Sequence, residues 1–151
     1  MRNKPQQMQV VKHVVSDREQ RQAQRFAASR NKVAQCEARL TELQGYHDSY
    51  QQGLAQRMAQ GIGVTALRDY QAFLAKLADA VRQQHDIVLR ARSESDTQRR
   101  LWQGAAQRVK VIDKVIEKRA LQLHRIESAH DQRETDERAL HATRGIDRGT
   151  T

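Results

Sequence analysis

The chain has 151 residues and carries 27 Lys and Arg against 18 Asp and Glu, so its formal net charge is +9. Apolar residues make up 38% and aromatic residues 4%, with seven glycines and one proline. This apolar content is low for a thick globular core, and glycine and proline are too few for a β-sandwich, a collagen or a Gly/Pro-rich linker. Because Ala, Gln, Arg, Glu, Leu and Lys favour helix, the composition predicts an extended helical protein.

In chain order, we expect a first helix over about residues 5–60, beginning at Pro5 or at Ser16. Gly61 and Gly63 interrupt it, and Thr65 can cap a second helix with its hydroxyl. The turn is predicted at about 61–65 and the second helix at about 66–141, followed by a frayed tail at 142–151. We expect the whole chain, 1–151, to form a single coiled-coil domain.

A heptad pattern runs along both predicted helices, as a coiled-coil seam requires. In the first helix the a positions are Phe26, Val33, Leu40, His47 and Leu54, and the d positions are Cys36, Leu43 and Tyr50. In the second helix the a positions recur every seventh residue from Leu67 to Glu137, and eight of these eleven are apolar. Its d positions, which begin at Tyr70, form a weaker seam.

A short turn makes neighbouring helices antiparallel. The predicted fold class is therefore all-α, a long antiparallel two-helix coiled coil or helical hairpin. A parallel dimer of long helices is the alternative, and the glycine pair argues against it. Ser95 and Gln98 place a polar stretch on the seam, which is a candidate weak or bending region.

The sequence offers no catalytic, cofactor-binding or metal site. A two-helix rod lacks the concave, dry pocket that enzymes need. The Gly61-x-Gly63 pair follows a helix and lacks the third glycine or lysine of a nucleotide loop. Glu127 and His130 share a helix face but lack the second motif of a di-iron bundle, so a solvated face is the better interpretation. Cys36 and His47 occupy seam positions, where packing and register roles are expected.

The cellular compartment follows from cysteine usage and hydropathy. Cys36, the one cysteine, cannot form an internal disulfide, which favours a cytoplasmic protein. Lys12 and His13 break up the N-terminal valines, so this stretch does not resemble a signal peptide. No run approaches the roughly 18 apolar residues of a membrane span, so we expect only peripheral membrane association or association through a partner.

The aromatic residues gather beside the predicted turn. If the helices pivot on Ile62, residues equally distant from it lie side by side, which pairs Tyr50 with Phe73 and Tyr46 with Leu77. Tyr46 and Phe73 fall beside the seam, where a thin rod cannot bury them fully. A partly exposed aromatic patch commonly marks a protein-binding site, although these side chains can also simply thicken the hairpin.

Most of the charge excess lies between Arg90 and Arg125, where ten basic and four acidic residues give +6. A basic helix can bind nucleic acid, but no helix-turn-helix or zinc finger accompanies it and no aromatic residues are interleaved for base stacking. A solvated or protein-facing charged face is the preferred interpretation, and a basic coiled-coil nucleic-acid binder is the alternative.

Several segments together resemble the FliJ family of the bacterial flagellar type III export apparatus. They are Leu43-Gln-Gly-Tyr46-His-Asp-Ser-Tyr50, the Gly61-Ile-Gly63 break, Leu67-Arg-Asp-Tyr70-Gln-Ala-Phe73-Leu74 and Gln83-Gln84. Trp102 with Arg108 and Lys110, and the run from Asp131 to Glu137, also resemble the second helix of that family.

The resemblance implies a non-enzymatic stalk that works with a hexameric export ATPase (FliI) and the export gate protein (FlhA), with export chaperones as further candidate partners and no small-molecule substrate. The terminal end of the hairpin would enter the ATPase ring. Gate contacts would map onto Leu43, Tyr46, Tyr50, Phe73, Leu77, Ala80 and Gln84. The implied location is cytoplasmic, peripheral to the inner membrane at the flagellar base. Stalk proteins of virulence type III secretion, the YscO group, are a close alternative.

Overall fold

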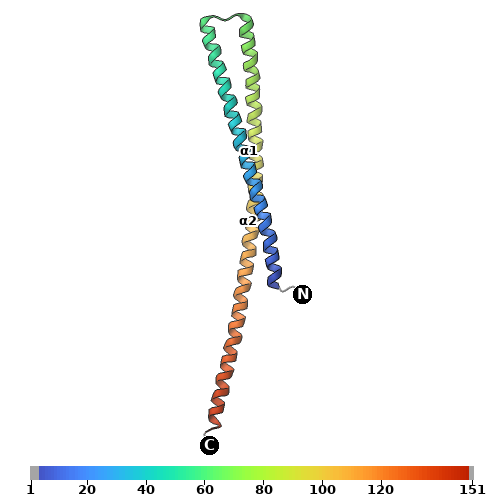
Figure 1. Ribbon diagram of the computed structural model, residues 1–151, viewed down its shortest axis with the longest axis vertical. Helices are drawn as coiled ribbons and strands as arrows, with labels where there is room; N and C mark the ends of the chain where they lie inside the picture. The colour runs from blue at the N-terminus through green and yellow to red at the C-terminus, as the bar shows by residue number, and fades with distance from the viewer. Residues whose placement is uncertain (1–3, 150–151) are drawn as a thin grey trace. The chain divides into compact units, whose positions relative to one another are not determined.

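The structure, a computed structural model, describes residues 4–149 and consists there of two α-helices (Figure 1). Helix α1 spans Lys4–Gln60 and helix α2 spans Val64–Asp147. No strand occurs in this described range. The 57 and 84 residues of these helices correspond to about 85 Å and about 125 Å at 1.5 Å per residue. The predicted all-α hairpin of two long helices is confirmed.

The turn between the helices is shorter than predicted, covering residues 61–63. Gly61 has a φ of +95°, a left-handed conformation that suits glycine and ends α1. The carbonyl of Gly63 accepts the first helical hydrogen bond of α2, from the Leu67 amide at 3.0 Å. Gly63 is therefore the N-cap, and the prediction of a Thr65 cap is wrong because Thr65 already lies inside the helix.

Helix α2 also runs further than predicted, to Asp147, with Gly145 inside it. The prediction of a frayed tail from residue 142 is wrong for 142–147. A glycine inside a helix costs only about 1 kcal/mol relative to alanine, which is not enough to end a long helix by itself. The last two residues of the predicted tail, 150 and 151, lie outside the described range.

The described residues form two compact units, which we describe one at a time. One unit comprises residues 17–106, and the other comprises 4–16 together with 107–149. We call them the turn unit and the terminal unit. The expectation of a single domain over 1–151 stays a prediction.

The core of the turn unit follows the predicted heptads. Its buried residues are Val88, Ala91 and Ala105, at 1%, 6% and 3% exposure, and all three stand at predicted a or d positions of α2. On α1 the predicted a positions from Phe26 to Leu54 are all half-buried. The small d residues Ala91 and Ala105 let the two helices approach closely, so the apolar faces of α1 and α2 pack into a thin core.

The antiparallel register agrees with a pivot at Ile62. Phe26 stacks on Trp102 with ring centroids 5.9 Å apart, and the Ser29 hydroxyl donates to the Ser95 hydroxyl at 3.3 Å. In a hairpin that pivots on residue 62, the numbers of two paired residues add up to about 124, and these two pairs add up to 128 and 124. Trp102 also donates its indole N–H to a Glu19 carboxylate oxygen at 2.8 Å. These contacts hold the two helices side by side in the part of the turn unit farthest from the turn.

The polar stretch predicted at Ser95 and Gln98 lies inside this seam. Both residues are half-buried, and Gln98 donates its side-chain amide to Glu94 at 3.0 Å. The side-chain oxygens of Gln98 and Gln22 are buried without a hydrogen-bond partner. Unpartnered polar atoms are costly, so this layer is less stabilising than the apolar layers at Val88 and Ala105.

In the terminal unit, the Lys12 ammonium lies 2.9 Å from an Asp113 carboxylate oxygen, a pairing that agrees with an antiparallel register about Ile62. A groove of about 620 Å³ lies between Pro5, Met8 and Gln9 of α1 and the Ile116–Ile126 stretch of α2. From residue 117 to residue 149 every residue is exposed. The half-buried part of the predicted seam therefore ends at Ile116, and Leu123, the next a position, is exposed and lines the groove together with Pro5 and Met8.

Candidate interaction site near the turn

The seven residues that we predicted to contact a partner lie on both helices of the turn unit. We call them the turn patch: Leu43, Tyr46, Tyr50, Phe73, Leu77, Ala80 and Gln84. Three of them are large and substantially exposed, namely Tyr46 at 48%, Tyr50 at 43% and Phe73 at 42%. The prediction that a thin rod cannot bury Tyr46 and Phe73 is confirmed.

Two of these rings touch across the helices. Tyr50 and Phe73 meet edge to face, with centroids 4.7 Å apart and planes at 63°. An edge-to-face pair of this kind contributes about 0.5–1.5 kcal/mol beyond the burial of its surface. Closer to the turn, the Arg57 guanidinium lies 5.3 Å from the centre of the Tyr70 ring. The predicted pairing of Tyr50 with Phe73 is confirmed.

The other members of the turn patch are less exposed. Leu43, Leu77 and Ala80 are half-buried. Gln84 is half-buried as well, and its side-chain amide donates to the backbone carbonyl of Cys36 at 3.0 Å. This bond ties α2 to α1, so Gln84 has a structural role within the hairpin.

A polar network next to the patch was missed by the sequence analysis. The Tyr46 hydroxyl donates to one oxygen of the Glu42 carboxylate at 3.0 Å, and Arg39 donates to the other oxygen at 2.9 Å. Hydrogen bonds from Arg39 and then Tyr46 lower the pKa of Glu42 below its ordinary value, whereas the bond to Glu42 raises the pKa of Tyr46. The spacing of three and four residues on one helix was the available signal.

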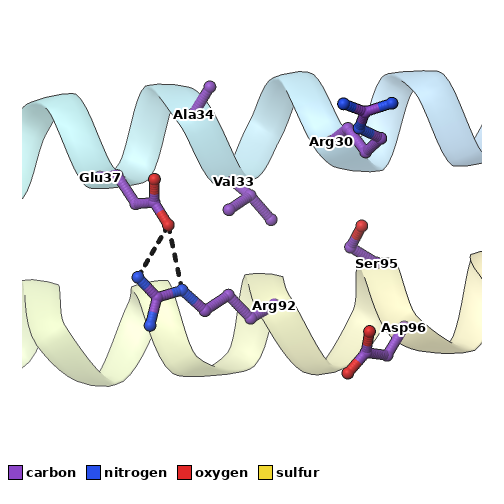
Figure 2. Close-up of a pocket in the computed structure, with 7 residues that line it drawn as sticks. All are labelled: Arg30, Val33, Ala34, Glu37, Arg92, Ser95 and Asp96. Atoms are coloured by element: carbon purple, nitrogen blue, oxygen red, sulfur yellow. Dashed lines mark hydrogen bonds and ion pairs between the residues drawn. The ribbon is translucent and has the colours of Figure 1, made fainter.

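A shallow hollow of about 360 Å³ lies further along the turn unit (Figure 2). Across it, the Arg92 guanidinium donates through two nitrogens to one Glu37 oxygen, at 2.8 and 3.0 Å. Arg30, Ser95 and Asp96 line its other end. Glu37 and Arg92 carry opposite charges, so this ion pair links the two helices across the hollow.

Side chains that could hold a metal gather at one place in the described range. His130, Asp131 and Glu134 have ligand atoms within 4.8 Å of one another, and all three are exposed on α2. Glu127, which the sequence analysis paired with His130, is not in this group. Exposed carboxylates on a solvated helix face commonly approach one another in this way. Cys36, at a predicted seam position, is half-buried.

The basic stretch from Arg90 to Arg125 is partly engaged in ion pairs. Arg92 pairs with Glu37 across the helices, and Arg99 pairs with Asp96 one turn before it at 3.3 Å. Within residues 4–149, neither helix has a segment apolar and long enough to cross a membrane.

The fold and its exposed rings define a class: an all-helical hairpin with a group of exposed aromatic rings near its turn. A family model described as "Flagellar FliJ protein" matches residues 4–145. The chain therefore belongs to the flagellar FliJ family, which makes it a component of the flagellar export apparatus. No curated protein and no solved structure is significantly similar to it.

Proposed function

We propose that this chain is a non-catalytic stalk that couples an export ATPase to the protein export gate. Its terminal unit binds a hexameric FliI-like ATPase, and its turn patch binds a FlhA-like gate protein. The observation that carries this proposal is the exposure of Tyr46, Tyr50 and Phe73 beside the turn, in a chain of the FliJ family. Exposed aromatic clusters on otherwise polar helices are typical of binding surfaces.

The coupling follows from symmetry. A single hairpin is asymmetric, whereas a hexameric ring offers equivalent subunits. Subunits that contact different faces of the hairpin are therefore stabilised in different conformations. The hairpin acts as a ligand of each subunit, and it shifts the conformational equilibrium of that subunit by the difference between its affinities for the two conformations. Contact alone then biases the ATPase cycle, and the stalk itself needs no catalytic group.

The groove of the terminal unit supports the assignment of this unit to the ATPase. Pro5, Met8, Ile116 and Leu123 give it an apolar lining, and Leu123 and Ile126 are 51% and 66% exposed. Replacing Leu123 and Ile126 with serine should abolish stimulation of ATP hydrolysis. A Leu89→Ser control, made on a residue 48% exposed in the turn unit, should stimulate normally. Normal stimulation by the Leu123/Ile126 variant would contradict the assignment.

The gate contact is tested by removing the three rings. A variant with alanine in place of Tyr46, Tyr50 and Phe73 should bind the purified cytoplasmic domain of the gate protein at least about 30-fold more weakly, as expected for aromatic hot spots. The matched control changes three apolar residues of similar exposure to alanine: Ile87, Leu89 and Leu101, at 41%, 48% and 48%. Unchanged gate binding by the first variant, with its helicity retained in circular dichroism, would refute the patch.

Location and further partners follow the same proposal. The stalk works in the cytoplasm, peripheral to the inner membrane at the flagellar base, and export chaperones are candidate partners that it escorts. The net charge of +9 is the observation that favours a second candidate function, nucleic-acid binding. Affinity for nonspecific DNA that falls steeply with salt, without any stimulation of the ATPase, would support that second candidate.

A further inference from the structure

The polar network beside the turn patch runs along one face of α1. Arg39, Glu42 and Tyr46 are spaced three and four residues apart, and hydrogen bonds of 2.9 and 3.0 Å join them in that order through the two oxygens of the Glu42 carboxylate. Arg39 and Glu42 are exposed, at 55% and 47% of their side chains. The end of this chain of bonds is the Tyr46 hydroxyl, on the most exposed ring of the patch.

We propose that Arg39 and Glu42 belong to the interaction surface as positioning residues, which hold Tyr46 so that its ring enters an apolar groove of the partner. This inference rests on the proposed gate-binding function. The partner groove is lined by aliphatic or aromatic side chains that take the ring, and the phenol oxygen makes no hydrogen bond to the partner. The Tyr46 hydroxyl keeps its hydrogen bond to Glu42 of the stalk instead.

The physical reason is twofold. An exposed tyrosine on a helix samples several rotamers, and fixing one of them on binding costs conformational entropy, which the bond to Glu42 removes in advance. A phenol that enters an apolar groove without a partner also loses a hydrogen bond to water. Glu42 supplies that bond, and Arg39 compensates the charge of the carboxylate at the rim of the surface.

The ionisation of these groups agrees with the same geometry. The hydrogen bond that the neutral phenol donates to Glu42 raises the pKa of Tyr46, and the negative charge of the carboxylate raises it further. The pKa of Glu42 is lowered, so its carboxylate stays ionised and able to accept both hydrogen bonds at neutral pH. The network is therefore formed under the conditions in which the stalk would bind.

A double-mutant cycle tests the proposal, with the full chain titrated calorimetrically into the purified cytoplasmic domain of the gate protein. Glu42→Ala and Tyr46→Phe should each weaken binding about threefold to tenfold, as expected when one side chain is no longer held in place. The double variant should bind no more weakly than either single variant. Asp96→Asn, which removes the exposed Asp96–Arg99 ion pair, is the matched control and should bind normally.

A spectroscopic measurement isolates the positioning effect. In an absorbance titration of tyrosine ionisation, Tyr46 is identified as the component that is missing in Tyr46→Phe. That component should shift to lower pH in Glu42→Gln, since the glutamine carries no charge. A titration curve unchanged by Glu42→Gln would overturn the network.

The remaining outcomes separate this inference from the proposed function. Additive losses in the double variant would mean that the phenol oxygen contacts the partner directly, which overturns the positioning role. Normal binding by both single variants, with binding lost in Tyr46→Ala, would also overturn the positioning role and leave the gate-binding patch in place. Normal binding by Tyr46→Ala would remove Tyr46 from the gate-binding surface and with it the positioning role, whereas the gate-binding function itself is decided by the variant that lacks all three rings.

Discussion

Replacing Trp102 tests how firmly the two helices of the turn unit are joined. Trp102 is the only tryptophan in the sequence, its ring stacks on Phe26 at 5.9 Å, and its indole N–H donates to Glu19 at 2.8 Å. Trp102→Ala removes both contacts. Trp102→Phe keeps an aromatic ring at the stack and removes only the donor.

The expected cost can be worked out from these contacts. The half-buried ring hides about 100 Å², worth about 2.5 kcal/mol at 25 cal/mol per Å², and the stack and hydrogen bond add about 1 kcal/mol each. The higher helix propensity of alanine and the burial already present in the unfolded chain reduce this sum. We expect Trp102→Ala to lower the free energy of unfolding by about 3 kcal/mol and Trp102→Phe to lower it by about 1 kcal/mol.

Urea unfolding followed by circular dichroism at 222 nm measures both variants. With an m value of about 2 kcal/mol per M, the alanine variant should unfold at about 1.5 M less urea than the parent. Leu101→Ala, on the neighbouring residue that is 48% exposed, is the control and should shift the midpoint far less. If Trp102→Ala and Leu101→Ala unfold at the same urea concentration, the Phe26 and Glu19 contacts contribute nothing and the packing argument is refuted.

Four further variants have clear expected signs. Gly61→Ala should destabilise the hairpin by about 1 kcal/mol or more in urea unfolding, because residue 61 has a φ of +95°, whereas Gly104→Ala, inside α2 with open space around it, should stabilise by about 0.5–1 kcal/mol. Arg92→Ala removes an exposed ion pair with Glu37, so it should cost less than about 1 kcal/mol, and the difference should shrink in about 1 M salt. Because the pKa of Glu42 is lowered from 4.5, its bonds stabilise the folded state above that pH and are lost as the pH falls through the lowered value. Urea midpoints of the parent and Glu42→Gln should therefore differ at neutral pH and converge in acid.

The heptad pattern was enough to predict which face of each helix is covered, but not how far the cover extends. Val88, Ala91 and Ala105 are buried where the register places them, yet Leu123, at a predicted a position, is 51% exposed. An apolar residue at seam spacing indicates the face that a partner would occupy. Leu123 lines an open groove with Pro5 and Met8 of α1, so the spacing places it on the face toward α1 while about half of it stays exposed.

The helix ends were less predictable because the competing signals differ by only small free energies. Thr65 and Gly63 are both acceptable N-cap residues, and the conformation of the turn selects Gly63. Gly145 weakens a helix by about 1 kcal/mol, which a helix of 84 residues tolerates.

For the candidate site, the pivot arithmetic placed Tyr50 beside Phe73, because distance from the turn alone decides which residues of an antiparallel pair are neighbours. The Arg39–Glu42–Tyr46 network could not be predicted from position in the same way. Polar side chains three or four residues apart are frequent on any charged helix, and the sequence does not say which of them adopt the bonding rotamers.

The turn of only three residues also has a consequence for how the hairpin assembles. The sequence separation of the contacts between helices rises steadily away from the turn, from 48 for Gln84 and Cys36 to 66 for Ser95 and Ser29, and to 83 for Trp102 and Glu19. The contacts near the turn close the shortest loops and therefore cost the least entropy. We expect the helices to zip together from the turn outward, so that the exposed rings beside the turn are in place before the contacts around Trp102 have formed.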